Sequence, residues 1–178
     1  MFKKVTFVSK IRKIMKKFLS YVVIFLAFVS CGEDISDKTS AVFQGVKDNG
    51  VWEGGNAVAT IEVGNKMTIK ASTLNETMSL KIPKPGAIVD PSNSNNFITY
   101  ALGTSLARKA SYVISTGTEV FTYETGIGVG DGEIVIKEYD GKVISGTFRF
   151  NAHNLDLESE AQEIVNMQNG VFYRVPVQ

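Results

Sequence analysis

The chain has 178 residues, with 19 Lys and Arg, 18 Asp and Glu, and a single Cys. This length suits one domain with an additional terminal segment, and a composition of 44% hydrophobic and 21% charged residues excludes a wholly disordered chain. Seven of the basic residues and none of the acidic ones precede position 31, so the remainder is net acidic. Because binding to phosphate backbones needs clustered Lys and Arg, we do not expect nucleic acid to be a partner.

The N-terminal segment has the features of an export signal. Lys16 and Lys17 lead into the apolar run 18–29, which ends at Ser30 and Cys31. A basic segment, a hydrophobic run of this length and a small residue before the cleavage point are typical of a secretory signal. The run is shorter than the roughly 20 residues that a membrane-spanning helix needs. We therefore interpret residues 1–30 as a signal peptide.

The only Cys of the chain stands at the predicted cleavage point. The segment Phe28-Val29-Ser30-Cys31 resembles a lipobox, in which a diglyceride is attached to the Cys thiol and the new amine is acylated. Phe28 is bulkier than the usual aliphatic residue at its position. The alternative is an ordinary cleaved signal with an incidental Cys31. Lipidation predicts membrane attachment through N-terminal acyl chains, at about 0.8 kcal/mol per buried methylene.

An acidic stretch follows the Cys. Glu33, Asp34 and Asp37 resemble the short signal that sends Bacteroidota lipoproteins to the outer cell surface, and a solvated linker is the alternative interpretation. We expect residues 31–40 to be an acidic tether in an outer membrane lipoprotein, facing the cell surface or the periplasm. Residues 1–14 fit the signal poorly, which favours Met15 as the true start of translation.

Strand-like alternation recurs throughout the rest of the chain. The alternating apolar positions are Ala57, Ala59, Ile61 and Val63; Met67, Ile69 and Ala71; Met78, Leu80 and Ile82; Ala110, Tyr112 and Ile114; Ile134 and Ile136; Ile144, Phe148 and Phe150; and Val171, Tyr173 and Val175. A period of two with many β-branched and aromatic residues predicts half-buried strands. Residues 41–178 are therefore expected to form one all-β domain. We predict an antiparallel meander of about ten strands in a sandwich-like or flattened barrel, with a closed up-and-down barrel as the alternative.

Turn signals separate these segments. They lie at Asn49-Gly50, Gly64-Asn65, Asn75-Glu76, Asp140-Gly141 and Asn169-Gly170. Directly opposed residues share a face of the sheet, so a correct loop length must bring apolar faces together. For Asn169-Gly170, a two-residue loop and a three-residue loop both bring apolar faces together.

The Asp140-Gly141 signal gives the most specific prediction. A three-residue loop, residues 139–141, sets Ile136 opposite Ile144 and places Gly141 in the left-handed conformation of a bulged type I turn. The same reasoning sets Ile61 opposite Ile69 and Ile69 opposite Ile82, which gives three consecutive strands a common apolar face.

Two segments lack strand periodicity. Residues 155–166, rich in acids, are expected to be a helical turn or a solvated loop that leads into a strand at 164–168. Residues 83–96 form the longest irregular stretch and contain three Pro. Irregular stretches of this length are often functional or mobile.

Few residues indicate a chemical site. His153 is the only His, and without a recognisable nucleophile motif it is expected to be structural or solvated. One His and one lipidated Cys do not make a nitrogen–sulfur metal site. The glycine-rich run 126–132 does not match the dinucleotide fingerprint and is expected to be a loop. We therefore predict no catalytic residue, no metal and no cofactor.

The only Trp offers the nearest approach to a sugar-binding pattern. Trp52 is followed by Glu53, and an aromatic ring beside a carboxylate occurs in many sugar sites. Trp52 also follows a turn signal, and large aromatic side chains dominate core burial. We expect Trp52 to cover one end of the core.

The second half of the chain carries a recognisable series of strand and turn motifs. Gly132-Glu133-Ile134-Val135-Ile136, Ile144-Ser145-Gly146-Thr147-Phe148-Arg149-Phe150 and Asn169-Gly170-Val171-Phe172 resemble a family of small Bacteroidota lipoproteins with a domain of unknown function. With Phe43-Gln44-Gly45 and Trp52, the resemblance extends over most of the chain after the signal. It implies an envelope location and an all-β fold, and it carries no catalytic residues.

The function expected from these features is binding rather than catalysis. We expect a membrane-anchored β domain that binds a small ligand, a glycan or another envelope protein through loops at one end. The alternative is a hydrolase that acts on envelope polymers or glycans through a pair of carboxylates.

Overall fold

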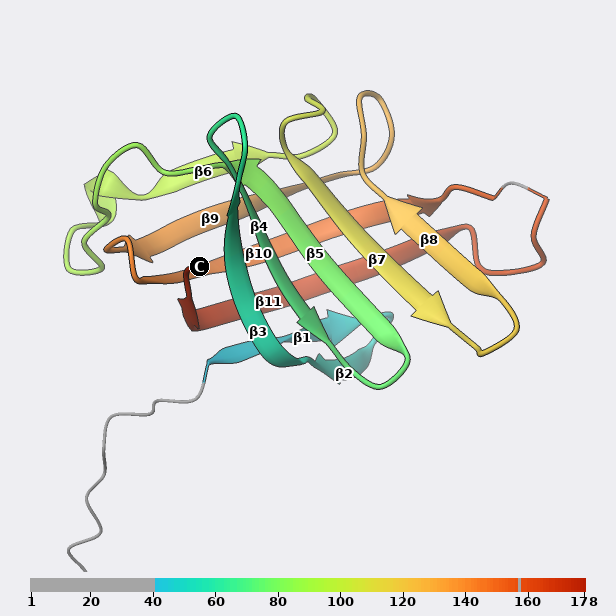
Figure 1. Cartoon of the computed structure of the whole chain (residues 1–178). Coiled ribbons are helices and arrows are strands. Elements are labelled where there is room, and N and C mark those ends of the chain that lie inside the picture. The colour runs from blue at the N-terminus through green and yellow to red at the C-terminus, as the bar shows by residue number, and fades with distance from the viewer. Residues whose placement is uncertain (1–40, 157) are drawn as a thin grey trace, which may run out of the picture. The chain divides into compact units, whose positions relative to one another are not determined.

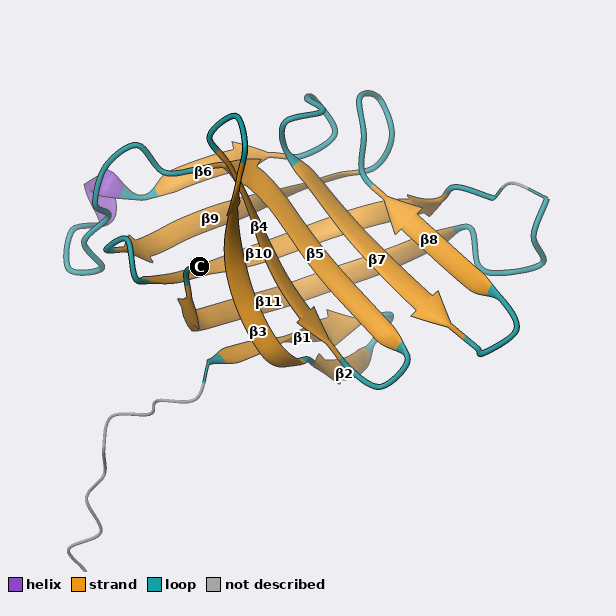
Figure 2. Cartoon of the chain, viewed as in Figure 1, coloured by secondary structure: helices purple, strands orange, loops and turns teal. Residues whose placement is uncertain are grey.

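The computed structural model describes residues 41–156 and 158–178 as a β domain with one short helical turn (Figure 2). The strands are β1 (Val42–Lys47), β2 (Gly50–Glu53), β3 (Gly55–Glu62), β4 (Lys66–Ser72), β5 (Glu76–Pro83), β6 (Ile98–Ala101), β7 (Lys109–Ser115), β8 (Val120–Glu124), β9 (Asp131–Tyr139), β10 (Val143–Asn154) and β11 (Ile164–Pro176). A 3-10 turn, η1 (Ser94–Asn96), precedes β6. The predicted signal peptide, Cys31 and the acidic tether lie outside the described residues. Within the described part, no helix has the length and hydrophobicity needed to span a bilayer.

All eleven strands belong to one antiparallel sheet. Its main path runs β2-β1-β11-β10-β8-β7-β5-β4-β3, and β9 joins it through β10 and carries β6 on its other side. Figure 1 shows β3, β4, β5, β7 and β8 as one layer, with β6, β9, β10, β11 and β1 crossing behind it at a steep angle. This arrangement confirms the predicted all-β class with its flattened, barrel-like form.

The sheet nearly closes where its β3 edge meets the segment that follows β11. Ala59 of β3 pairs in parallel with Val177, just after β11. The Gln178 N–H donates to the Ala59 carbonyl over 2.8 Å, and the Ile61 N–H donates to the Gln178 carbonyl over 3.0 Å. On the same side, Gly54 forms the corner between β2 and β3, and an added Cβ there would lie 2.5 Å from the Trp52 ring. A barrel of this kind leaves few exposed strand edges.

The chain departs from a plain meander at β6. β5 pairs with β7 rather than with β6, and β6 pairs instead with β9. The irregular stretch predicted at 83–96 makes this detour, and within it Val89 forms a backbone bridge with Tyr139. The predicted three-residue turn required Tyr139 to be a loop residue. Tyr139 is instead a buried residue of β9.

The space between the two layers is filled by side chains. A group of aromatic side chains forms part of this core: the Phe43 ring lies 5.1 Å from that of Phe148 and 5.9 Å from that of Trp52, and Phe172 stacks beside them. Met67, Ile69, Leu80 and other aliphatic residues of the front layer are fully buried against this group. The interior is thus a packed core, which leaves binding to the ends and the outer faces.

The predicted faces are right except in β11, but the predicted registers are wrong, in most pairs by two residues. Ile136 lies opposite Gly146 rather than Ile144, and Ile144 lies opposite Tyr139. Two-residue slips of the same kind occur elsewhere: Ile61 faces Met67, and Ile69 faces both Ala59 and Leu80. Parity fixes the face of the sheet on which a side chain lies, and it cannot separate registers that differ by two.

The hairpin predicted at Asn169-Gly170 does not exist. Both residues lie inside β11, where Asn169 has φ +51° and the pairing with β10 shifts by one residue. A second positive φ, +47° at Arg174, makes Tyr173 point outward and leaves Phe172 and Val175 in the core. These bulges explain why a turn signal and a simple alternation both failed in this segment.

The acidic segment after β10 is a loop. Residues 155–156 and 158–163 contain no helix, and β11 begins at Ile164, which confirms the second of the two predicted alternatives. Asn154 organises the start of this loop: its side chain accepts from the Asp156 N–H and donates to the Ser159 hydroxyl.

Candidate functional site

Two connected groups of polar side chains lie at one end of the barrel, which we call the lower end. It is formed by the turns 48–49, 73–75 and 116–119 and by the loop 155–163, which lie toward the lower right of Figure 1. The β1–β2 turn is tight because Asp48 and Asn49 adopt φ values of +47° and +69°, as a two-residue hairpin loop requires. It places Trp52 of β2 against the lower end of the core, with 3% of its surface exposed.

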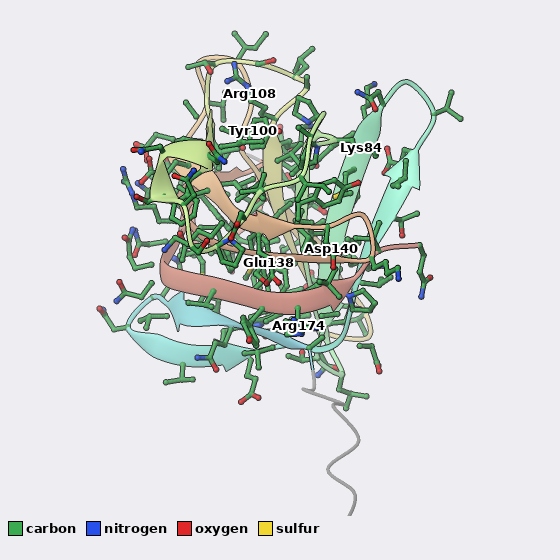
Figure 3. All side chains as sticks on the ribbon, turned by 90° about the vertical axis from the view of Figure 1, so that its left-hand side faces the viewer. Lys84, Tyr100, Arg108, Glu138, Asp140 and Arg174 are labelled. Atoms are coloured by element: carbon green, nitrogen blue, oxygen red, sulfur yellow. The ribbon has the colours of Figure 1, made fainter. Side chains whose placement is uncertain are left out.

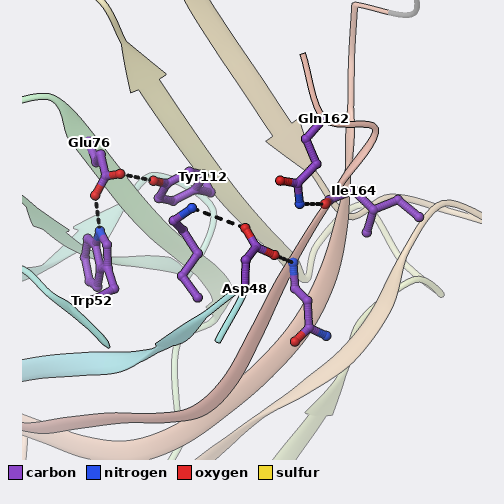
Figure 4. A network of polar contacts seen from close by, with 8 residues as sticks. Asp48, Trp52, Glu76, Tyr112, Gln162 and Ile164 are labelled. Carbon is purple, nitrogen blue, oxygen red and sulfur yellow. Dashed lines mark hydrogen bonds and ion pairs between the residues drawn. The ribbon is translucent and has the colours of Figure 1, made fainter. Parts of the chain in front are cut away.

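Glu76 is the centre of the first group. It begins β5 after the turn 73–75, which is closed by a bond of 2.9 Å from the Thr73 N–H to the Glu76 carbonyl. One carboxylate oxygen accepts from the Trp52 indole N–H over 2.6 Å, and the other accepts from the Tyr112 hydroxyl (Figure 4). Burial raises the pKa of Tyr112 far above its usual value, and the bond to Glu76 and that residue's charge raise it further. The Tyr112 hydroxyl therefore stays protonated and donates a hydrogen bond to a carboxylate that is held from two sides.

Asp48 is the centre of the second group. Its carboxylate forms an ion pair of 3.2 Å with Lys47 and accepts from the Asn166 backbone N–H over 2.9 Å. Burial works to raise the pKa of Asp48, but these two bonds outweigh it and hold the pKa below the ordinary value. Lys47 also lies 5.5 Å from the centroid of the Tyr112 ring, in cation–π geometry, and so connects the two groups (Figure 4).

A surface hollow of about 450 Å³ adjoins the first group. It is lined by Thr73, Leu74, Asn75, Glu76, Ile114, Ser115 and Thr116. Its wall combines two aliphatic side chains with hydroxyl, amide and carboxylate groups, and its volume falls in the range of small-molecule sites. We call it the Glu76 hollow.

The sequence did not point to this arrangement. It placed Trp52 in the core, which is confirmed, but it paired Trp52 with Glu53, whose side chain is exposed on the opposite face of β2. The true partner, Glu76, is 24 positions away, and Tyr112 is a further 36 positions from Glu76. The signals in the sequence were a lone Trp and an acid directly after a turn, and only the strand pairing brings them together.

Other residues singled out in the sequence lie elsewhere. His153 is a half-buried residue of β10, paired with Glu124 and Ile164. The glycine-rich run forms the loop 125–130 and the start of β9, where Asp131 accepts from the Asn151 amide. Glu133 forms an ion pair of 3.0 Å with Arg149. Within residues 41–156 and 158–178, no three His, Cys, Asp or Glu side chains are placed to hold a metal ion.

The electrostatics of Asp48 bear on the alternative of a hydrolase with a carboxylate pair. A glycosidase of the two-carboxylate type needs one carboxyl group with a raised pKa as its general acid. Asp48 has a lowered pKa instead. Asp48 is thus better suited to accepting hydrogen bonds than to acting as such a general acid.

Comparison with known proteins gives a family and no assigned activity. No curated protein matches the chain, and no solved structure matches it either. A family model described as a domain of unknown function, DUF6252, matches residues 39–176 and therefore all of the β domain except its last two residues. The chain belongs to the DUF6252 family.

Proposed function

We propose that the chain is a lipoprotein of the bacterial cell envelope whose β domain binds a glycan in the Glu76 hollow. The observation that carries the binding part is the Glu76 carboxylate, which two buried donors fix at the wall of a hollow. A carboxylate has about four acceptor sites, so two remain for a ligand. Sugars offer hydroxyl donors together with apolar ring faces, which match Glu76 on one side and Leu74 and Ile114 on the other.

The native Trp gives a direct readout of binding. Trp52 is the only Trp of the chain, and its indole N–H is bonded to Glu76. Titrating the β domain with soluble peptidoglycan fragments and with N-acetylglucosamine oligomers should therefore change its intrinsic fluorescence. Asn75→Arg, which fills the hollow from an exposed turn, should weaken binding by at least about tenfold.

A matched variant separates the hollow from general effects of charge. Asn95→Arg makes the same change at an exposed position of η1, away from the hollow, and should leave the affinity unchanged. Equal losses in both variants, or no fluorescence change with any of these glycans, would reject the glycan proposal.

The anchoring part rests on the Cys31 motif. We propose that Cys31 carries the acyl chains and that residues 31–40 tether the β domain to the outer membrane. Cells that express the chain should incorporate a fatty-acid analogue into it, and Cys31→Ser should abolish the label. Retention of the label in that variant would exclude Cys31 as the site.

The side of the membrane needs a separate measurement. We propose display at the cell surface, on the basis of the acids that follow Cys31. Protease added to intact cells should then remove the domain as completely as it does in lysed cells. Protection in intact cells with cleavage after lysis would place the domain on the periplasmic face.

A further inference from the structure

The two ends of the β domain carry loops of opposite charge. The loops β3–β4, β6–β7 and β8–β9 (residues 63–65, 102–108 and 125–130) project together at the top of Figure 1, and we call this the upper end. They contain no Asp or Glu, and Arg108 is their one charged residue. The turns and the loop of the lower end contain no Lys or Arg, and they hold the acids Asp48, Glu119, Asp156, Glu158, Glu160 and Glu163.

Each upper loop exposes an aliphatic side chain. Val63 is 98% exposed, Leu106 67% and Ile127 63%. These loops are anchored to their surroundings, since the Gly128 N–H donates to the Gly103 carbonyl and the Lys84 N–H donates to the Asn65 carbonyl, each over 2.9 Å. The protein thus holds three separate apolar side chains outward from one end.

Cations surround these side chains. Lys66, Lys84 and Arg108 have no ion-pair partner among the residues that the structure describes. Figure 3 places Arg108 at the top of the domain and Lys84 in its upper part. Leu106 also borders a hollow lined by Lys81 and Lys109, but these two lysines form ion pairs with Glu62 and Glu124. The positive charge beside the exposed aliphatic groups therefore comes from Lys66, Lys84 and Arg108.

This combination fits one kind of surface. The core of a protein–protein interface is closely packed, shape-complementary and depleted of charged residues, whereas separate protruding aliphatic groups beside cations suit a fluid bilayer with anionic headgroups. We propose that the upper end docks on an anionic phospholipid surface, with Val63, Leu106 and Ile127 at the headgroup boundary and Lys66, Lys84 and Arg108 against the phosphates. Repulsion of the acidic lower end favours the same orientation and keeps the Glu76 hollow away from the lipid.

The docking does not require the proposed lipid anchor, but the two are compatible. Residues 31–40, fully extended, reach at most about 35 Å. The eight-residue strand β5 spans about 27 Å. A tether attached at Cys31 is therefore long enough to let either end of the domain approach the membrane.

A polarity-sensitive dye tests the orientation. Residues 39–178 form a compact unit of their own and lack Cys31, the only Cys, so one introduced Cys is a unique label site. Dye on Leu106→Cys should shift to the blue with vesicles of phosphatidylcholine and phosphatidylglycerol, and added salt should reduce the shift. Dye on Leu74→Cys, at a lower-end residue that is 97% exposed, should not respond. An equal response at both sites, or the same response to pure phosphatidylcholine, would overturn the proposal.

Unlabelled variants test the aliphatic contacts. The triple variant Val63→Ser, Leu106→Ser and Ile127→Ser should lower vesicle affinity by at least about tenfold, because each side chain loses its apolar burial. Leu74→Ser with Val120→Ser removes exposed aliphatic groups from the lower end and should leave the affinity for vesicles unchanged. Failure of the unmodified domain to bind these vesicles would overturn the proposal. A photo-crosslinker at position 106 that, in cells, forms adducts with proteins and none with lipids would also overturn it. Because the isolated domain lacks Cys31, the vesicle results do not depend on lipidation.

Discussion

Asp48 combines a structural and an electrostatic role at the lower end. It adopts φ +47° in the β1–β2 turn and joins that turn to the start of β11 through the Asn166 N–H. Its pKa lies below the ordinary 3.8 because the bonds from Asn166 and Lys47 outweigh the effect of burial. A carboxyl group with a lowered pKa in the folded state stabilises the protein above its unfolded pKa, and this stability disappears as the pH falls through the folded pKa.

The Asp48→Asn variant tests that contribution. Asn tolerates the left-handed backbone and keeps an oxygen for the Asn166 N–H, so mainly the charge is lost. We expect a decrease of at most about 1 kcal/mol in the free energy of unfolding at neutral pH, because solvent screens a side chain that is 26% exposed. The difference from the unmodified domain should shrink as the pH falls below about 3.8. Urea unfolding at a series of pH values measures it, and a difference that stays constant down to pH 3 would contradict this role.

At the scale of the strands, the turn at Gly141 shows that local hydrogen bonds decide where a turn lies. Gly141 has φ +87°, as predicted, but the turn is centred on Gly141 and Lys142 rather than on 139–141. The Asp140 carboxylate accepts from the N–H groups of Lys142 and Val143 over 2.7 and 2.8 Å and so fixes this position. Lys137 is an extra, unpaired residue in β9, that is, a β-bulge. Because of this bulge, the side chain of Ile136 points into the core.

Substitutions at Gly141 separate backbone strain from packing. No atom lies within 4 Å of the place where a Cβ would stand, so the only cost is that of the left-handed backbone. Gly141→Val should lower the free energy of unfolding by at least about 1–2 kcal/mol, because β-branching adds to the clash. Gly141→Asn should cost less. Denaturant melts that give both variants the same midpoint would contradict the left-handed turn.

The other strand predictions were right or wrong for a similar reason: local alternation shows which side chains are buried, but it does not show how the strands pair. The alternation of Met78, Leu80 and Ile82 reports burial directly, so the faces of such strands were predictable. Registers depend on turn hydrogen bonds and bulges, which alternation does not encode. Asn169-Gly170 looked like a turn because Asn readily adopts positive φ, and a bulge inside β11 uses the same property. The Trp52–Glu76–Tyr112 group was hidden for this reason, since it exists only in the correct pairing of β5 with β7.

For the molecule as a whole, sequence patterns predicted a barrel-like sheet but not how it closes. Closure depends on Val177 and Gln178, which follow the last periodic segment and lie beside β3, more than a hundred residues earlier in the chain. No local pattern marks that contact. The seam also explains why Ala59 is fully buried in a strand that would otherwise lie at the edge of the sheet.

Removal of Val177 and Gln178 should therefore open the seam. The bonds lost are those from the Val177 N–H to the Lys142 carbonyl, from the Gln178 N–H to the Ala59 carbonyl, and from the Ile61 N–H to the Gln178 carbonyl. At about 1 kcal/mol for each bond, together with the partial burial of Val177, we expect the free energy of unfolding to fall by about 2–4 kcal/mol. The uncovered part of β3 should also promote self-association, which size-exclusion chromatography would detect. Gln178→Ala keeps the backbone bonds and should resemble the unmodified domain. A truncated domain that is as stable and as monomeric as the full one would show that the two layers hold together without the seam.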